Sequence, residues 1–213
     1  INVDGSNLKQ LTVTKGMMPN WSNDGAMILY KGLEGFLYLM RSDGTKKKRV
    51  STAPIDYKGE WSPNGMNVAY TAKGTEDGYS DANISVVDNA LQGMYILADR
   101  IVKEMVVNQV TDDGGNLLPK WFPDGNSLVY ESRCSIKKVN VSLRQVTESE
   151  TLMEGYWPQV SYRGDILASS CDDPNHIFLR KVFDSSNIFL IEDSVNLYNP
   201  KWSPDGTKVS YTS

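Results

Sequence analysis

Short apolar runs alternate with polar turns along the whole of this chain. Five runs of about four residues each follow a turn that ends in glycine, and their alternating or continuous apolar pattern is typical of strands. These runs cover residues 27–30, 67–70, 127–130, 165–168 and 208–211. A second set of apolar runs, joined by turn signals such as Asp43-Gly44, predicts a second hairpin in each unit. The second hairpins are predicted over residues 1–12, 36–51, 83–111, 134–147 and 176–192.

The turn before each strand of the first set is a sequence repeat. Its consensus is Trp-Ser-Pro-Asp-Gly, and proline, Asp or Asn, and glycine are the residues that a tight hairpin turn favours. Copies occupy residues 21–25, 61–65, 121–125 and 202–206, with a degenerate copy at 160–164. Their final glycines are separated by 40, 60, 39 and 42 residues, so one unit carries about 20 additional residues. A proline also recurs two residues before the Trp position, at Pro19, Pro119, Pro158 and Pro200, with Gly59 in the second unit.

Two hairpins in about 40 residues correspond to one four-stranded blade of a β-propeller. The repeated Trp is then most simply a wedge packed between neighbouring sheets. The chain begins with a second hairpin and ends with a first hairpin, so residues 1–12 and 198–213 are predicted to share one blade and close the ring. The prediction is an all-β, five-bladed propeller with four antiparallel strands per blade. A piece of a larger ring would give the same sequence pattern.

The motif Pro-x-Trp-Ser-Pro-Asp-Gly, complete at residues 200–206 and preceded in the first unit by Leu11-Thr12, resembles the repeat of TolB-type β-propellers. The same repeat is found in the propellers of prolyl-oligopeptidase-like enzymes. The resemblance spans essentially the whole chain and implies one propeller domain over residues 1–213, in an extracytoplasmic location such as the periplasm or cell surface. TolB-type rings often have six blades, and the fourth unit departs from the motif at Val160, Tyr162 and Arg163.

The residue before each Trp position lies on the strand that resembles the innermost strand of a propeller blade. Five polar side chains are therefore predicted to face the central channel: Asn20, Glu60, Lys120, Gln159 and Lys201. Aromatic residues lie nearby in the sequence: Tyr57, Tyr156, Trp157 and Tyr198. Aromatic rings beside hydrogen-bonding groups suit a concave site for a sugar, a peptide or another small polar ligand. The alternative is that the polar groups line a wet channel while the rings pack between blades.

Composition and charge narrow the choice of function. The formal net charge is -4, with 22 basic and 26 acidic residues, which argues against a nucleic-acid-binding module. One histidine and two cysteines exclude a histidine-rich metal site and the paired Cys spacing of a zinc site, and we expect no cofactor and no metal. His176 has no Gly-x-Ser-x-Gly motif beside it, so a catalytic role is not expected. No apolar run reaches the length of about 18 residues that a membrane span needs.

Three further features leave alternatives open. Cys134 and Cys171 occupy nearly equivalent positions in consecutive units, so a disulfide and two free thiols are both compatible with the sequence. The acidic pairs at 112–113 and 172–173 have the composition of Ca²⁺ ligands, although turn and cap roles are more usual. The long unit contains a polar loop at 73–81 and a mixed run at 94–110, which predicts extended strands more readily than a helix.

These observations favour a non-catalytic, monomeric scaffold that presents a protein-interaction or small-ligand-binding surface at the channel mouth. One alternative is a propeller fragment of a larger prolyl-oligopeptidase-like hydrolase. Another is a carbohydrate-acting enzyme, which would need two carboxylates facing a common cleft, and Glu60 is the only carboxylate in the predicted channel set.

Overall fold

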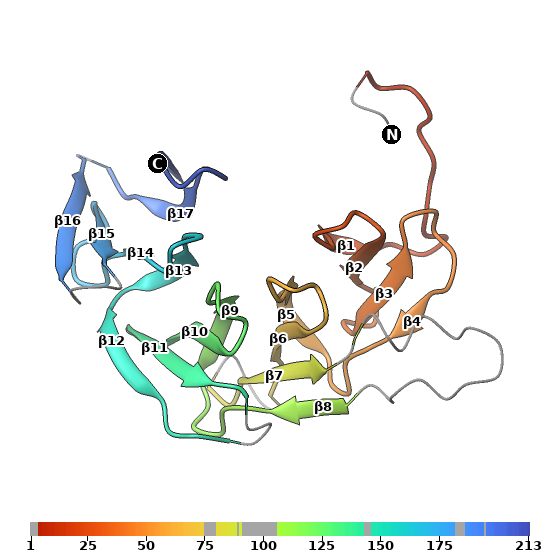
Figure 1. The fold of residues 1–213 in the computed structure, drawn as a ribbon, viewed down its shortest axis with the longest axis horizontal. Coiled ribbons are helices and arrows are strands. Elements are labelled where there is room, and N and C mark those ends of the chain that lie inside the picture. The colour runs from red at the N-terminus through yellow and green to blue at the C-terminus, as the bar shows by residue number, and fades with distance from the viewer. Residues whose placement is uncertain are drawn as a thin grey trace.

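The computed structural model describes residues 4–74, 80–88, 90, 106–142, 146–181, 186–193 and 195–213. Every regular element in these residues is a β-strand, and the strands form four antiparallel sheets of four strands and one of two. Figure 1 shows the sheets side by side along an arc, with β1 at one end and β17 at the other. The all-β, propeller-like architecture predicted from the repeat is thereby confirmed.

The sheets follow each other along the chain, and we call the four-stranded sheets blades I to IV. Blade I contains β1 (Met17–Trp21), β2 (Met27–Lys31), β3 (Leu37–Arg41) and β4 (Lys48–Arg49). Blade II contains β5 (Ile55–Trp61), β6 (Val68–Ala72), β7 (Asn83–Asp88) and β8 (Val106–Gln109). Blade III contains β9 (Asn116–Trp121), β10 (Ser127–Ser132), β11 (Ser135–Asn140) and β12 (Glu150–Glu154). Blade IV contains β13 (Tyr156–Val160), β14 (Ile166–Ser169), β15 (His176–Arg180) and β16 (Asn187–Glu192), and the terminal hairpin contains β17 (Tyr198–Trp202) and β18 (Val209–Thr212).

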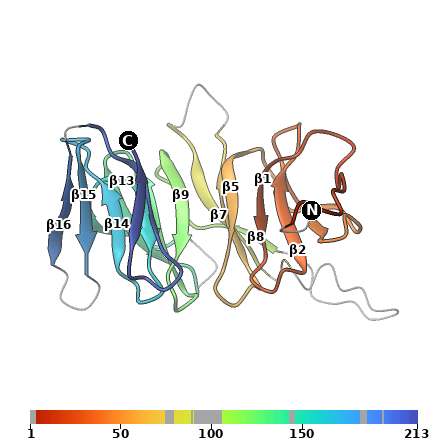
Figure 2. The same cartoon turned by 90° about the horizontal axis from the view of Figure 1, so that it is seen from above.

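The first strand of each sheet lies on the inner side of the arc. Strands β1, β5, β9, β13 and β17 face one another there, and each contacts the next one along the chain. Figure 2 shows the same strands from above, standing roughly upright beside each other. The prediction that the residue before each Trp position lies on an inner strand agrees with this arrangement.

The repeated pentapeptide forms the predicted turn between the first two strands of each unit. Its glycine has a positive φ in all five copies, between 66° and 93°, a conformation that side chains with a Cβ rarely adopt. In the first copy, Ser22 Oγ donates to Asp24 Oδ1 at 2.6 Å and accepts the backbone N–H of Met27 at 2.9 Å. The serine and the acidic residue therefore satisfy the polar groups that the turn would otherwise leave unpaired.

The hydrophobic core consists of separate clusters between neighbouring sheets. Leu29 and Leu39 of blade I pack with Trp61 and Val68 of blade II, and similar clusters fill the next junctions along the arc. Each cluster is built by alternate residues of short strands, which is why the apolar pattern has a period of two. Stability in such an array is approximately the sum of each sheet and its contacts with its neighbours.

The predicted closure of the ring is not found, and the structure has four complete blades and a two-stranded fifth unit. Residues 4–16 form no strand, and within the described residues no further strand pairs with β17 or β18. Figure 1 places the two termini apart, on opposite sides of the arc opening. The physical reason is that Leu11 packs against Ile28, Tyr30 and Met40 on the open face of blade I instead of extending toward the terminal hairpin.

One strand of blade III lies later in the chain than predicted, and two predicted segments cannot be compared with the structure. The last strand of blade III begins at Glu150, whereas the second hairpin of that unit was expected to end at residue 147. Residues 182–185, where the hairpin predicted over 176–192 would turn, and most of the long-unit insertion lie outside the described residues. Among the described residues no helix has the length and apolar character that a membrane crossing requires.

Candidate functional site

All five inner strands carry an irregularity at the same place, just before the Trp position. In four of them, two residues of the inner strand oppose one residue of its neighbour, as between Met17 and Asn20 in β1, which is the pattern of a β-bulge. The bulge places one residue of each strand in the left-handed region, with φ between 51° and 54°. These residues are Met18, Tyr57, Leu118, Trp157 and Asn199. A non-glycine residue rarely adopts this conformation. Its recurrence in all five inner strands therefore indicates a regular feature of the repeat.

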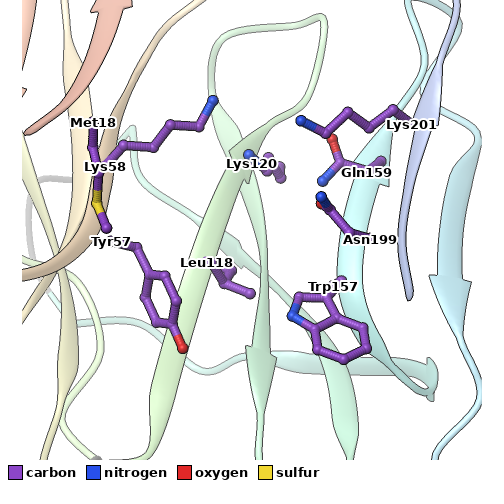
Figure 3. A pocket seen from close by; sticks show the side chains of 9 residues that line it. All are labelled: Met18, Tyr57, Lys58, Leu118, Lys120, Trp157, Gln159, Asn199 and Lys201. Carbon is purple, nitrogen blue, oxygen red and sulfur yellow. The ribbon is translucent and has the colours of Figure 1, made fainter. Parts of the chain in front are cut away.

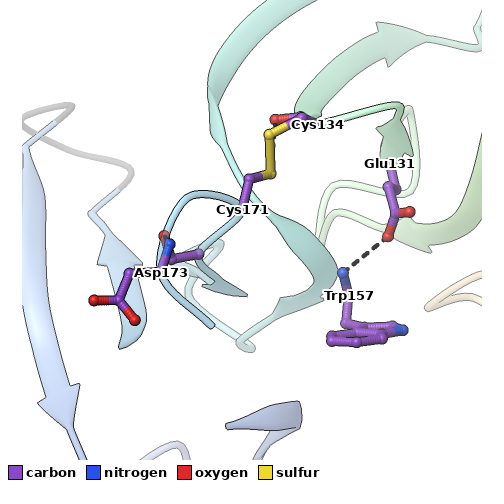
Figure 4. The surroundings of a disulfide bond; sticks show 6 residues. Glu131, Cys134, Trp157, Cys171 and Asp173 are labelled. Atoms are coloured by element: carbon purple, nitrogen blue, oxygen red, sulfur yellow. Dashed lines mark hydrogen bonds between the residues drawn. A yellow bond between two sulfur atoms is a disulfide. The ribbon is translucent and has the colours of Figure 1, made fainter. Parts of the chain in front are cut away.

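Side chains of the preceding blade hold two of these residues in place. Thr71 Oγ1 in blade II accepts the backbone N–H of Leu118 in blade III at 3.2 Å. Glu131 Oε2 in blade III accepts the backbone N–H of Trp157 in blade IV at 3.0 Å, as the dashed line in Figure 4 shows. Thr71 and Glu131 each lie six residues after the glycine of their own turn. The strained backbone is therefore fixed by a contact that also joins neighbouring blades.

The left-handed residues surround a cavity of about 280 Å³ on the inner side of the arc. Its lining comes from all five inner strands and is drawn in Figure 3: Met18, Tyr57, Lys58, Leu118, Lys120, Trp157, Gln159, Asn199 and Lys201. A second cavity of about 390 Å³ adjoins it and shares four lining residues with it: Lys58, Lys120, Gln159 and Lys201. Glu60 and three of the repeat tryptophans, Trp61, Trp121 and Trp202, contribute to this second space.

Most of the predicted site residues do meet at these cavities. Tyr57, Lys120, Trp157, Gln159 and Lys201 line the first cavity, and Glu60 lines the second. The other three predicted residues, Asn20, Tyr156 and Tyr198, line neither.

Each of these three instead contacts a residue that does. Asn20 Nδ2 donates to the carbonyl of Gly59 at 2.9 Å and lies 3.5 Å from Glu60 Oε2. Tyr156 and Tyr198 lie against the Trp157 ring, with centroid separations of 6.0 and 5.3 Å.

Four lining residues were missed by the sequence analysis: Met18, Lys58, Leu118 and Asn199. Three of them immediately precede the proline that recurs before the Trp position. Proline favours extended backbone in the residue before it, so its recurrence marks the position but does not predict the left-handed conformation. The bulge turns the side chain of that residue toward the channel, which a regular two-residue alternation does not predict.

The polar end of the site is an ion cluster around Glu60. Its carboxylate pairs with the ammonium groups of Lys120 and Lys58, the second at 3.2 Å. Burial raises the pKa of Glu60, but Lys120 and Lys58 outweigh that effect and hold the pKa below its ordinary value, so the carboxylate is ionised at neutral pH. Burial lowers the pKa of Lys120, and Glu60 opposes this effect. Glu60 is the only acidic residue among the described residues that line the two cavities.

The other candidate groups have structural contacts. Asp113 Oδ1 accepts from Asn116 Nδ2 at 2.7 Å, and its other oxygen accepts from Lys137 Nζ at 2.9 Å. His176 Nδ1 lies 3.5 Å from Asp173 Oδ2 and its Nε2 lies 3.8 Å from a Glu192 oxygen. Within the described residues, no group of three or more His, Cys, Asp or Glu side chains is placed to hold a metal ion.

The two cysteines form a disulfide between blades III and IV. Cys134 lies in the turn after β10, Cys171 follows β14, and their Cα atoms are 5.9 Å apart (Figure 4). Of the two alternatives compatible with the sequence, the structure contains the bonded one. Cys134 lies three residues after Glu131 in the chain, and the bond links the same two blades that the hydrogen bond between Glu131 and Trp157 joins.

Comparison with solved structures identifies the fold. TolB from Acinetobacter baumannii is similar over 97% of this chain, with a TM-score of 0.67 and 18% sequence identity. A protein assigned as TolB from Agrobacterium tumefaciens is similar over 94% of the chain, with a TM-score of 0.62 and 20% identity. The chain spans 51% of the first protein and 77% of the second. No protein-family model matches the chain, and no curated protein matches its sequence. The chain therefore has a TolB-like propeller fold, as its repeat predicts.

Proposed function

We propose that this chain is a non-catalytic propeller module that binds a small polar ligand or a segment of a protein partner at the mouth of its central channel. The observation that carries this proposal is the cavity of about 280 Å³, which side chains of all five inner strands line together. Concave sites with aromatic walls and a few convergent polar groups are the usual form of ligand sites. A rigid arc of sheets holds these groups without requiring movement on binding.

The lining residues support binding and argue against catalysis of glycoside cleavage. That reaction uses two carboxyl groups on opposite sides of the scissile bond, at a separation of at least about 5 Å. The described lining supplies one carboxylate, Glu60, and two lysines already pair with it. His176, in blade IV, is not among the lining residues.

An extracytoplasmic location, such as the periplasm or a cell surface, is part of this proposal. The Cys134–Cys171 disulfide supports it, because disulfides persist in oxidising compartments and are rare in the cytosol. The TolB-like fold supports it only by analogy. We further propose that the described sheets act as one domain and as a monomer, with neither a cofactor nor a metal.

The proposal is tested by amide NMR on the ¹⁵N-labelled chain with a panel of monosaccharides, disaccharides, short peptides and small organic acids. Binding at the channel mouth predicts shifts concentrated at Tyr57, Leu118 and Trp157, and Trp157→Ala should weaken it about tenfold or more. Tyr162→Ala is the matched control, because Tyr162 is an exposed aromatic residue in a turn. Shifts confined to residues outside the two cavities, or no binding from any member of the panel, would overturn the proposal.

A further inference from the structure

Blade II departs from the repeat at the edge of the cavity. In the other four units, proline separates the left-handed residue from the polar residue before the Trp position. In blade II two residues, Lys58 and Gly59, occupy that interval, so β5 has one residue more in its bulge. The additional length brings a lysine side chain into the cavity, where proline stands in the other units.

Blade III lacks this departure and has the same kind of tryptophan wedge as blade II. Trp61 remains buried, and its Nε1 still donates to the backbone carbonyl of Asn20 in blade I at 3.4 Å. The longer bulge also imposes a constraint, because a Cβ on Gly59 would lie 2.9 Å from Leu37 Cδ2. The longer bulge constrains the core at Gly59 and leaves the position of Trp61 unchanged. We therefore attribute it to the group that it adds to the cavity, which is the Lys58 ammonium group.

Lys58 gives one end of the cavity an excess of positive charge. Figure 3 shows the amino groups of Lys58 and Lys201 extending toward Lys120 from opposite sides. These three lysines line both cavities, and Glu60 is the one carboxylate that the described part of the chain contributes to the lining, so this cluster has two positive charges in excess. Charges of one sign along a concave, partly desolvated wall concentrate a ligand of the opposite sign.

The opposite end of the same cavity is aromatic. Figure 3 shows Tyr57 and Trp157 on opposite sides of the space, with Leu118 between them. Trp157 is held firmly, because Glu131 accepts its backbone N–H and the Tyr198 ring lies edge-on to it at 5.3 Å between centroids. Rigid aromatic side chains favour a ligand with a ring whose face can pack against them.

We propose that this site binds a small organic anion in which a carboxylate is attached to a ring, with the carboxylate at Lys58, Lys120 and Lys201 and the ring between Tyr57 and Trp157. This inference rests on the proposed function, since it names the ligand class of the same cavity. An aromatic acid and a sugar acid share this chemistry, and the two are distinguished by direct comparison.

The test uses two pairs of probes that differ in charge and keep the ring: benzoate with benzamide, and glucuronate with glucose. Affinities are measured by NMR titration of the whole chain at low ionic strength, because salt screens the attraction. Each acid should bind about tenfold or more tightly than its neutral partner. Lys58→Met should remove about that advantage, while Lys48→Met, at an exposed position in β4, should leave it unchanged.

The outcomes separate this inference from the proposed function. The inference is supported if one acid or both bind more tightly than the neutral partner, with shifts at the cavity, and if Lys58→Met removes this preference. Which acid binds then shows whether the ligand is an aromatic acid or a sugar acid. The anion assignment is overturned if charged and neutral probes bind the cavity equally, or if Lys58→Met leaves the affinity unchanged. In both cases the proposed binding function is still supported. Failure of all four probes to bind overturns the anion assignment as well, and the wider panel then decides whether the cavity binds anything.

Discussion

The tryptophan of the repeated turn has one environment in blade I, at the end of the arc, and another in blades II and III, in its middle. Trp61 and Trp121 are 7% and 8% exposed, and each indole N–H donates to the backbone of the preceding blade. Trp21 has the same place in the motif but is 55% exposed, and among the described residues Leu11 is the main apolar cover on that face of blade I. The motif therefore forms the turn by itself, but its tryptophan becomes a wedge only where a sheet lies behind it.

This contrast distinguishes local from tertiary causes in the same sequence motif. The turn geometry depends on residues within five positions, and its glycine has a positive φ in all five copies. Burial of the indole depends on a neighbouring sheet that lies about 40 residues away in the chain. In a nearest-neighbour array, each junction contributes its own share of stability, so equivalent substitutions should have very unequal effects.

We expect the largest loss of stability when a buried tryptophan of the repeat is replaced, and a much smaller loss for the exposed one. Trp61→Ala should lower the free energy of unfolding by about 3–5 kcal/mol, because it opens a cavity between blades I and II. Trp21→Ala should lower it by less than about 1 kcal/mol, because its ring is mostly in solvent. Urea unfolding of the two variants measures both values. Equal losses would contradict the assignment of Trp61 as a wedge and Trp21 as a largely uncovered residue.

The disulfide extends the comparison to the junction between blades III and IV. Replacing Cys134 and Cys171 together by Ala should lower the free energy of unfolding by about 3 kcal/mol, because the bond closes a long loop in the unfolded chain. Reduction of the unmodified chain should have a similar effect on its melting temperature. A chain whose melting temperature does not change on reduction would show that this junction does not depend on the bond.

Glu60 joins the inter-blade structure to the candidate site. Glu60→Gln leaves Lys120 without its carboxylate and should cost about 2 kcal/mol, less than for a fully buried pair because both side chains are partly exposed. Adding Lys120→Met to Glu60→Gln should recover most of this loss. A double variant as unstable as the single one would contradict the pairing.

The pH dependence provides a second check on the same pair. Because the folded-state pKa of Glu60 lies below 4.5, its stabilising contribution is complete above pH 4.5 and is lost as the pH falls through the folded-state value. The melting temperature should therefore fall less steeply below pH 4.5 in Glu60→Gln than in the unmodified chain. Parallel pH profiles would contradict the assigned pairing.

The smallest expected effect concerns the left-handed residues. Thr71→Val removes the acceptor for the backbone N–H of Leu118 and should cost about 1 kcal/mol. Lys31 lies at the equivalent place in blade I, six residues after its turn glycine, and has no oxygen to offer. Lys31→Met should therefore leave stability within about 0.5 kcal/mol of the unmodified chain. Urea unfolding of the two variants checks the difference, and equal effects would deny that Thr71 holds the bulge.

The sequence predicted those features that depend on local chemistry and on the repeat. The turns, the four-stranded sheets and the inner position of residues such as Glu60 and Lys120 follow from proline, glycine and alternation. The predicted pairing of residues 1–12 with the terminal hairpin was wrong, because the local pattern of these residues carries no information on where Leu11 will pack. The fold could be predicted without knowing which ligand the protein binds.

The candidate site was predicted less completely, because part of it depends on bulges. A strict two-residue alternation places Lys120 and Lys201 at the channel but gives no reason to place Leu118 or Asn199 there. Lys58 was missed because the second unit was treated as a loss of the proline. The structure shows instead a longer bulge that adds a cation. Departures from a repeat can therefore be more informative about function than its conserved turn residues.

If the longer bulge of blade II serves the site and not the fold, shortening it should weaken binding and leave folding intact. Deleting Lys58 alone restores the length of the other units and keeps Gly59, whose position leaves little room for a Cβ beside Leu37. The melting temperature of this variant and its affinity for benzoate are measured beside those of the unmodified chain. We expect a melting temperature within a few degrees of the unmodified chain and a loss of about tenfold or more in benzoate affinity. Unchanged affinity, or a chain that no longer folds, would contradict this role of the bulge.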